Sequence, residues 1–196
     1  MNVLEKLTRL DFWLFSKING EWTNVVFDSL FPFLRESMIW IPFYLFLLVF
    51  ILLNFGREGV YWSLGLIITA ALCDIISSHV IKEAITRIRP CRDAALAHPV
   101  RFLVTYCPRS SSFVSSHAVN HFGMAMFLYT TLRPLTSAWI SCIFGWAAVI
   151  AYAQVYVGVH FPLDVICGAL VGCLLGYVIS RIYKYTEFIP KSMLTR

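Results

Sequence analysis

The stretch VYVGVHFPLDV, residues 155–165, places His160 and Asp164 four residues apart where an apolar segment begins. Pro162 lies between them, and proline is well tolerated in a first helical turn because its missing N–H has no partner there. A helix that starts here carries His160 at its entrance and Asp164 one turn in, on the same face. The carboxylate can then hold one imidazole nitrogen and leave the other free to attack or to accept a proton. Capping or packing also explains such a pair, so its meaning depends on the rest of the chain.

The composition is that of a membrane protein. The 196 residues are 59% hydrophobic and 14% charged, with a mean hydropathy of +0.72, whereas a soluble domain is about half apolar and about a quarter charged. Residues 1–20 contain several charges and lack the apolar core of a cleavable signal peptide. Segments close to the ~20 residues that a bilayer core requires predict an all-α, polytopic bundle of about five transmembrane helices: 38–53, 60–81, 117–132, 138–156 and 163–183.

The N-terminal segment has a different pattern. Its apolar residues recur at helical spacing between charges, which predicts one or two amphipathic helices lying in the membrane interface. A sixth, imperfect span over residues 21–34 is the alternative, but it is short and contains Asp28. We therefore divide the chain into an interfacial segment, residues 1–35, and a membrane domain, residues 36–196, with an active-site loop at residues 82–117.

Basic residues are concentrated in that loop and in the C-terminal tail. The positive-inside rule would make the loop cytoplasmic, whereas an anion-binding role would exempt its charges from the rule. The tail is the cleaner signal: its basic residues place it in the cytoplasm, and five spans then put the loop outside. No recognition module accompanies these charges, so nucleic-acid binding has no support. The loop residues are Lys82, Arg87, Arg89, Arg92, Arg101 and Arg109, and those of the tail are Arg181, Lys184, Lys191 and Arg196.

The loop ends in a serine-rich run, residues 110–116, directly before His117. Serines cap helix N-termini, but free N–H groups at such a terminus also form an anion cradle. Cys91 and Cys107 lie in the same loop, and an extracytoplasmic location would favour a disulfide between them over two free thiols. Asp74, one helical turn before Ser78, either binds a neighbouring helix or serves function.

Together these clusters resemble the type 2 phosphatidic acid phosphatase superfamily, over residues 37–185. The family's motif KxxxxxxRP is intact as KEAITRIRP, residues 82–90, here called motif one. Its PSGH corresponds to VSSH, residues 114–117, motif two. Its SRxxxxxHxxxD corresponds to AQVYVGVHFPLD, residues 153–164, motif three.

The resemblance implies a metal-independent, cofactor-free phosphatase that works through a phosphohistidine. His160 would be the nucleophile that attacks phosphorus, and Asp164 would orient its imidazole. His117 would protonate the leaving oxygen and then activate the hydrolytic water.

The same resemblance assigns the phosphate-binding groups. Lys82 and Arg89 would neutralise the phosphoryl oxygens. Ser115 and the backbone N–H of Ser116 would complete the oxyanion cradle at the helix N-terminus.

Motif three departs from the family at its arginine, which is Gln154 here, next to Ala153 in place of serine. One phosphate-binding charge is therefore missing. Arg87, Arg92 and Arg109 are candidates to replace it, and our hypothesis is that Arg109 supplies part of the charge. Motif two also has Val114 for proline and Ser116 for glycine, which keeps the backbone donor.

A site at the end of membrane helices favours a lipid substrate with a phosphate head group. Undecaprenyl pyrophosphate, phosphatidylglycerol phosphate, phosphatidic acid and lipid A phosphates are all compatible, and we favour the first and the last. The expected location is a bacterial inner membrane, with the site facing the periplasm or exterior. The alternatives are a lipid-to-lipid phosphotransferase and a non-catalytic lipid-phosphate binder weakened by Gln154.

Overall fold

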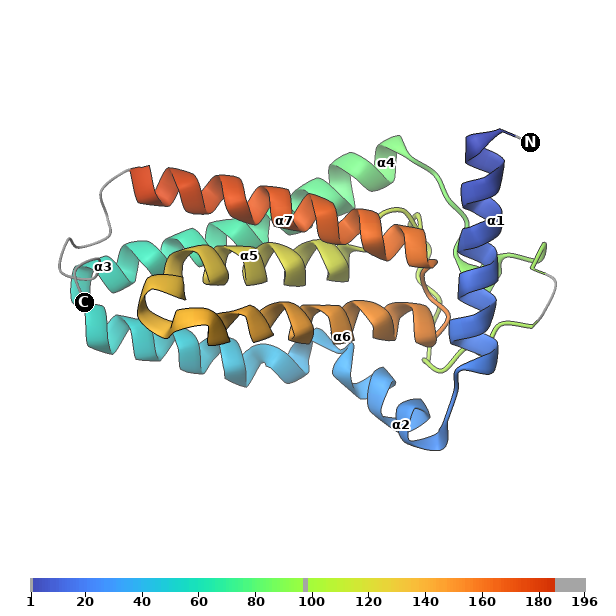
Figure 1. The fold of residues 1–196 in the computed structure, drawn as a ribbon, viewed down its shortest axis with the longest axis horizontal. Helices are drawn as coiled ribbons and strands as arrows, with labels where there is room; N and C mark the ends of the chain where they lie inside the picture. Colours follow the sequence, from blue (N-terminus) through green and yellow to red (C-terminus); the bar gives the residue numbers. More distant parts are fainter. Residues whose placement is uncertain (1, 97–98, 186–196) are drawn as a thin grey trace.

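The structure, a computed structural model, describes residues 2–96 and 99–185 and contains only helices and loops in these residues. Long helices lie side by side in a bundle, and α1 lies across one end of it (Figure 1). The prediction of an all-α protein is confirmed. The helices are α1 (Val3–Ser16), η1 (Lys17–Glu21), α2 (Val25–Leu34), η2 (Ser37–Trp40), α3 (Ile41–Ile75), η3 (Ile76–Ile81), α4 (Lys82–Ala84), η4 (Pro90–Arg92), α5 (Ser116–Thr136), η5 (Ser137–Ser141), α6 (Cys142–Tyr156) and α7 (Pro162–Tyr185).

Three continuous helical segments of the described chain are long and apolar enough to cross a membrane: Ser37–Ala84, Ser116–Tyr156 and Pro162–Lys184. The first contains Gly56, whose positive φ of 53° interrupts the helix, and the chain reverses there at the end far from α1 (Figure 1). The second reverses at Ser137, with φ 61°. This second reversal lies a few residues after residue 132, where the sequence predicted the end of the span over residues 117–132.

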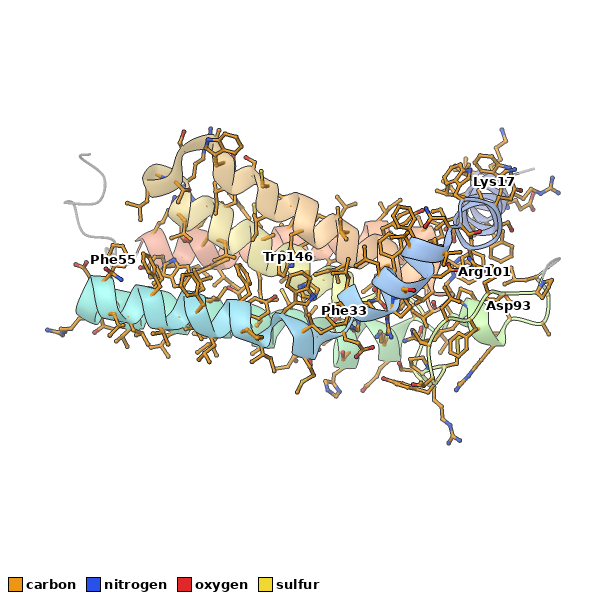
Figure 2. All side chains as sticks on the ribbon, turned by 90° about the horizontal axis from the view of Figure 1, so that it is seen from below. Lys17, Phe33, Phe55, Asp93, Arg101 and Trp146 are labelled. Carbon is orange, nitrogen blue, oxygen red and sulfur yellow. A yellow bond between two sulfur atoms is a disulfide. The ribbon has the colours of Figure 1, made fainter. Side chains whose placement is uncertain are left out.

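The two ends of the bundle differ in their side chains. Phe55 lies at the end far from α1, Trp146 lies near the middle, and Arg101 lies beside the N-terminal helices (Figure 2). Polar and charged groups that are buried cluster at the α1 end, where the motifs meet.

The N-terminal segment forms helices, as predicted. Asn2 caps α1 in a capping box with Glu5, and apolar side chains on its outer face remain exposed. Its inner face packs Phe12 and Phe15 on Phe161, with ring centroids 5.0 and 5.2 Å apart. The segment thus covers the start of α7.

A glycine seam joins α5 to α7. A Cβ on Gly168 would lie 2.9 Å from the carbonyl oxygen of Ser115, and one on Gly172 would overlap the carbonyl of Val119. Only glycine allows backbones to approach this closely. The seam fixes the start of α5, which carries motif two, against the start of α7, which carries motif three.

Candidate active site

The His160–Asp164 pair is fully inside the protein, with side chains 3% and 0% exposed. His160 Nδ1 lies 3.6 Å from Asp164 Oδ2. The same oxygen accepts hydrogen bonds from Ser112 Oγ at 2.6 Å and from the N–H of Phe161 at 2.9 Å. The turn before the pair needs Gly158, whose φ is 85°. Asp164 therefore both caps α7 and faces the imidazole, so the capping and functional interpretations are compatible.

Arg89 occupies the other side of the imidazole. Its Nη1 lies 2.9 Å from His160 Nε2, the carbonyls of Ser110, Ser111 and Val159 accept three further N–H groups, and Ser110 Oγ accepts one from Nη2 at 3.1 Å. Because a guanidinium only donates, Nε2 is the acceptor and the ring proton belongs on Nδ1, toward Asp164. Burial lowers the pKa of His160 to about 4, although Asp164 opposes this, so the imidazole is neutral at pH 7. The Nε2 lone pair thus accepts a hydrogen bond from a cation.

Motif two contributes the start of α5. Ser115 is the N-cap residue, its N–H donates to the carbonyl of Asp164 at 3.1 Å, and its buried Oγ has no hydrogen-bond partner among the described residues. Ser116 Oγ lies 3.1 Å from Ser78 Oγ. His117, in the first turn, interacts electrostatically with His160 and with the half-buried Lys82. The structure thus brings the expected histidines, cations and serines to one end of the bundle.

Two residues near the pair have roles that the sequence did not indicate. Arg87 Nη1 donates to Asp164 Oδ1 at 2.5 Å, and its Nη2 donates to Asp11 on α1. Asp11 also accepts the N–H of Leu163 at 2.7 Å. The guanidinium lies over the ring of Phe161, 4.3 Å from its centroid. Arg87 therefore orients the carboxylate of motif three rather than standing free for a phosphate.

Two further expectations concern residues outside the pair. Cys91 and Cys107 form a disulfide, which closes a segment of the active-site loop directly after Arg89. Asp74 Oδ1 accepts a hydrogen bond from Asn120 Nδ2 on α5 at 3.3 Å, so this carboxylate links two helices.

The family model of the PAP2 superfamily matches residues 59–188. The chain belongs to the PAP2 superfamily. Its apolar helices accordingly make it an integral membrane protein with multiple passes. The match contains all three motifs.

Individual relatives of this PAP2 protein are distant. The lipid A 4'-phosphatases of Porphyromonas gingivalis and Bacteroides thetaiotaomicron are 25% and 27% identical, over 94% and 90% of this chain and 77% and 78% of theirs. The undecaprenyl-diphosphatase of Sulfolobus acidocaldarius is 30% identical over 75% of this chain and 65% of its own. The crystal structure of Aquifex aeolicus LpxE superimposes with a TM-score of 0.63 at 30% identity, covering 88% of this chain and 95% of that one. The transmembrane PAP2-type phosphatidylglycerolphosphate phosphatase of Bacillus subtilis shares the fold, with a TM-score of 0.60, 24% identity, and coverage of 97% and 90%.

The PAP2 motif-three arginine is replaced by Gln154, which is completely buried. Arg109 is exposed, and no hydrogen bond or ion pair to it is found among the described residues. Arg92 is also exposed and donates to the carbonyl of Cys107 at 2.8 Å. A different cation reaches Gln154: Arg35 Nε donates to its Oε1 at 3.3 Å. Arg35 follows α2, far from every motif in the sequence, and no local pattern distinguished it.

Proposed function

We propose that this protein is a lipid phosphatase that hydrolyses a phosphomonoester or pyrophosphate on a lipid head group through a phosphohistidine on His160. The observation that carries the proposal is the placement of His160 Nε2, 2.9 Å from Arg89 Nη1, with Nδ1 turned toward Asp164. A phosphoryl oxygen that binds Arg89 brings phosphorus next to a neutral, oriented nucleophile.

The first half-reaction forms a bond from His160 Nε2 to phosphorus and breaks the bond from phosphorus to the leaving oxygen. His117 donates a proton to that oxygen, so the lipid alcohol, or a lipid monophosphate from a pyrophosphate, leaves protonated at this oxygen. Asp164 stabilises the positive charge that the phosphorylated imidazole acquires. In the second half-reaction His117 takes a proton from water, the water oxygen attacks phosphorus, and inorganic phosphate leaves His160.

Charge on the transferred phosphoryl group is stabilised by side chains and backbone donors. Lys82 and Arg89 supply the positive charge, while Ser115 Oγ and the N–H of Ser116 supply hydrogen bonds at the start of α5. The buried, unpartnered Oγ of Ser115 supports this assignment, because a phosphate oxygen would give it a partner. The scheme uses neither a metal ion nor a cofactor.

The substrate that we favour is a lipid A phosphate or undecaprenyl pyrophosphate. The names of the relatives support both choices, and the active site lies at one end of apolar helices, where a head group would meet it. We further propose five membrane crossings in a bacterial inner membrane, with α1 and α2 at the interface. The Cys91–Cys107 disulfide supports a site that faces the periplasm or exterior, where thiols oxidise.

Phosphate release by the purified protein in detergent tests the proposal. The substrates are lipid A, undecaprenyl pyrophosphate, phosphatidylglycerol phosphate and phosphatidic acid, each with EDTA present. We expect release from at least one lipid, lost in His160→Ala and retained in His79→Ala, a matched control whose imidazole is 70% exposed. Release that EDTA abolishes, or that His160→Ala retains, would contradict the mechanism.

A second arm adds an acceptor lipid with free hydroxyls. Phosphate that appears on this lipid rather than in solution would assign the protein to phosphotransfer. Absence of any release, together with retained binding of the lipid, would make it a lipid-phosphate binder.

A further inference from the structure

Gln154 leaves an electrostatic deficit in the pocket. The transferred phosphoryl group carries charge on several oxygens. Each preorganised donor that faces it typically contributes about 100-fold or more in rate. A glutamine can donate a hydrogen bond but brings no charge. Its Nε2 is buried and has no hydrogen-bond partner among the described residues. Gln154 therefore has a buried N–H donor that a bound ligand could use.

Arg35 lies against this glutamine although it comes from outside the motifs. It is the C-cap residue of α2, its side chain is 8% exposed, and its Nε donates to Gln154 Oε1 at 3.3 Å. The backbone here is held in place because Arg35 N–H bonds the carbonyl of Phe31 at 3.2 Å and Trp40 Nε1 bonds that of Leu34 at 2.8 Å. The guanidinium is thus delivered to a defined place.

The charge of Arg35 is incompletely compensated. Its ion-pair partner in the described chain is Glu36, 3.0 Å from Nη1, and that carboxylate is 56% exposed. A buried cation is costly unless a negative group faces it. Arg35 lies close enough to Arg89 and His117 for its charge to act on both of them. Cations gathered in one pocket repel one another, and an anion between them removes that repulsion.

We infer that Arg35, held by Gln154, is a phosphate-binding residue that takes the place of the missing motif-three arginine. The inference rests on the proposed phosphatase function and deepens it. The positive charge that the family motif places on α6, at the position of Gln154, is supplied here from the end of α2. Arg35 precedes the matched family region, residues 59–188. Gln154 Nε2 then donates to the same phosphate or to its leaving group, which gives this buried donor a partner.

The test compares Arg35→Gln with the double variant Arg35→Gln/Gln154→Arg, which returns the charge to motif three. We expect kcat/KM to fall about 100-fold in the single variant, and the double variant to recover to within about tenfold of the wild type. Arg133→Gln, which changes an exposed arginine at the far end of α5, is the matched control and should retain wild-type turnover. Arg35→Met fills the same space without charge and replaces the glutamine variant if that variant does not fold.

A second readout does not depend on turnover. Inorganic phosphate should raise the melting temperature of the wild type and of Arg133→Gln, but not that of the Arg35 variants. If the wild type shows no phosphatase activity but phosphate stabilises it through Arg35, the proposed function fails and the binding role of Arg35 stands. Turnover and phosphate stabilisation within twofold of the wild type in Arg35→Gln or Arg35→Met would overturn the inference. So would a double variant no more active than the single one, because Arg35 would then be structural only.

Discussion

Arg87 Nη1 lies 2.5 Å from Asp164 Oδ1, so the carboxylate that faces His160 is also half of an ion pair. The other guanidinium nitrogen binds Asp11, which is 5% exposed and also holds the N–H of Leu163. One arginine thereby connects the N-terminal helix to the proposed nucleophile. The orientation of His160 depends on a residue, Asp11, that lies far outside the family motifs.

Replacing Arg87 should therefore affect both stability and turnover. In Arg87→Gln two buried carboxylates lose their cation, and breaking such a pair typically costs about 3 kcal/mol. We expect a lower free energy of unfolding and a kcat reduced about tenfold or more, because Asp164 is free to turn away from His160. Denaturation and steady-state kinetics check this, with the exposed Arg57→Gln as control. An unchanged free energy of unfolding would show that the ion pairs of Arg87 do not stabilise the fold.

Asp164→Asn should reduce kcat by about 100-fold or more while KM changes little. An asparagine can still contact Nδ1, but it cannot stabilise the charge that the imidazole gains when phosphorus binds Nε2. Asp74→Asn is a suitable control, since this carboxylate bonds Asn120 between helices instead. The prediction would be wrong if both variants lost the same activity.

The pH dependence of stability should report on His160. Burial lowers its folded-state pKa from 6.5 to about 4, so between these values the unfolded chain binds a proton that the folded chain does not. Stability therefore falls as pH drops from 6.5 to 4, by on the order of 3 kcal/mol from this residue. Equilibrium unfolding of the wild type and His160→Gln at several pH values checks it, and the variant should show the flatter profile. Identical pH profiles for the two proteins would contradict the assignment of this loss of stability to His160.

The glycine seam should not accept even one methyl group at Gly172, where the backbones of α5 and α7 lie close together. Gly172→Ala places Cβ onto the carbonyl of Val119, so α5 and α7 must separate, at a cost of about 1–3 kcal/mol. We expect a lower melting temperature and slower turnover. Gly145→Ala on α6 meets nothing within 4 Å and should be neutral. Equal effects in both variants would rule out a special role for the seam.

The disulfide should stabilise the loop that carries Arg89. Its cysteines are 16 residues apart. A disulfide that closes a loop of this size stabilises the folded state by about 3 kcal/mol, because it lowers the conformational entropy of the unfolded chain. Cys91→Ser/Cys107→Ser should melt earlier than the wild type and show a higher KM. Cys142→Ser removes a free cysteine and serves as the control. A double variant that melts with the wild type would disprove this contribution.

The motif residues could be identified from the sequence because each motif is a short continuous stretch. His160 and Asp164 are one helical turn apart, and the spacing alone places both on the start of α7. The turn at Gly56 follows from glycine's access to positive φ, and the amphipathic N-terminus follows from its periodicity.

The contacts that no local pattern predicts are those between distant segments. Arg87 was a candidate for phosphate binding until the structure showed two carboxylates around it, and Asp11 resembled any other charge on an amphipathic helix. Arg109 was chosen for its nearness in sequence to motif two, whereas Arg35 reaches Gln154 only because α2 packs beside the end of α6. Such pairings depend on tertiary packing, which a single sequence does not reveal.

The glycine seam has one more consequence, for the movement of lipid into the site. Since α5 and α7 contact each other through their backbones, the first turn of α5, which bears His117, is packed against the start of α7, directly after His160. If the proposed function holds, a long-chain lipid that enters sideways from the bilayer would pass between other helices and not between α5 and α7.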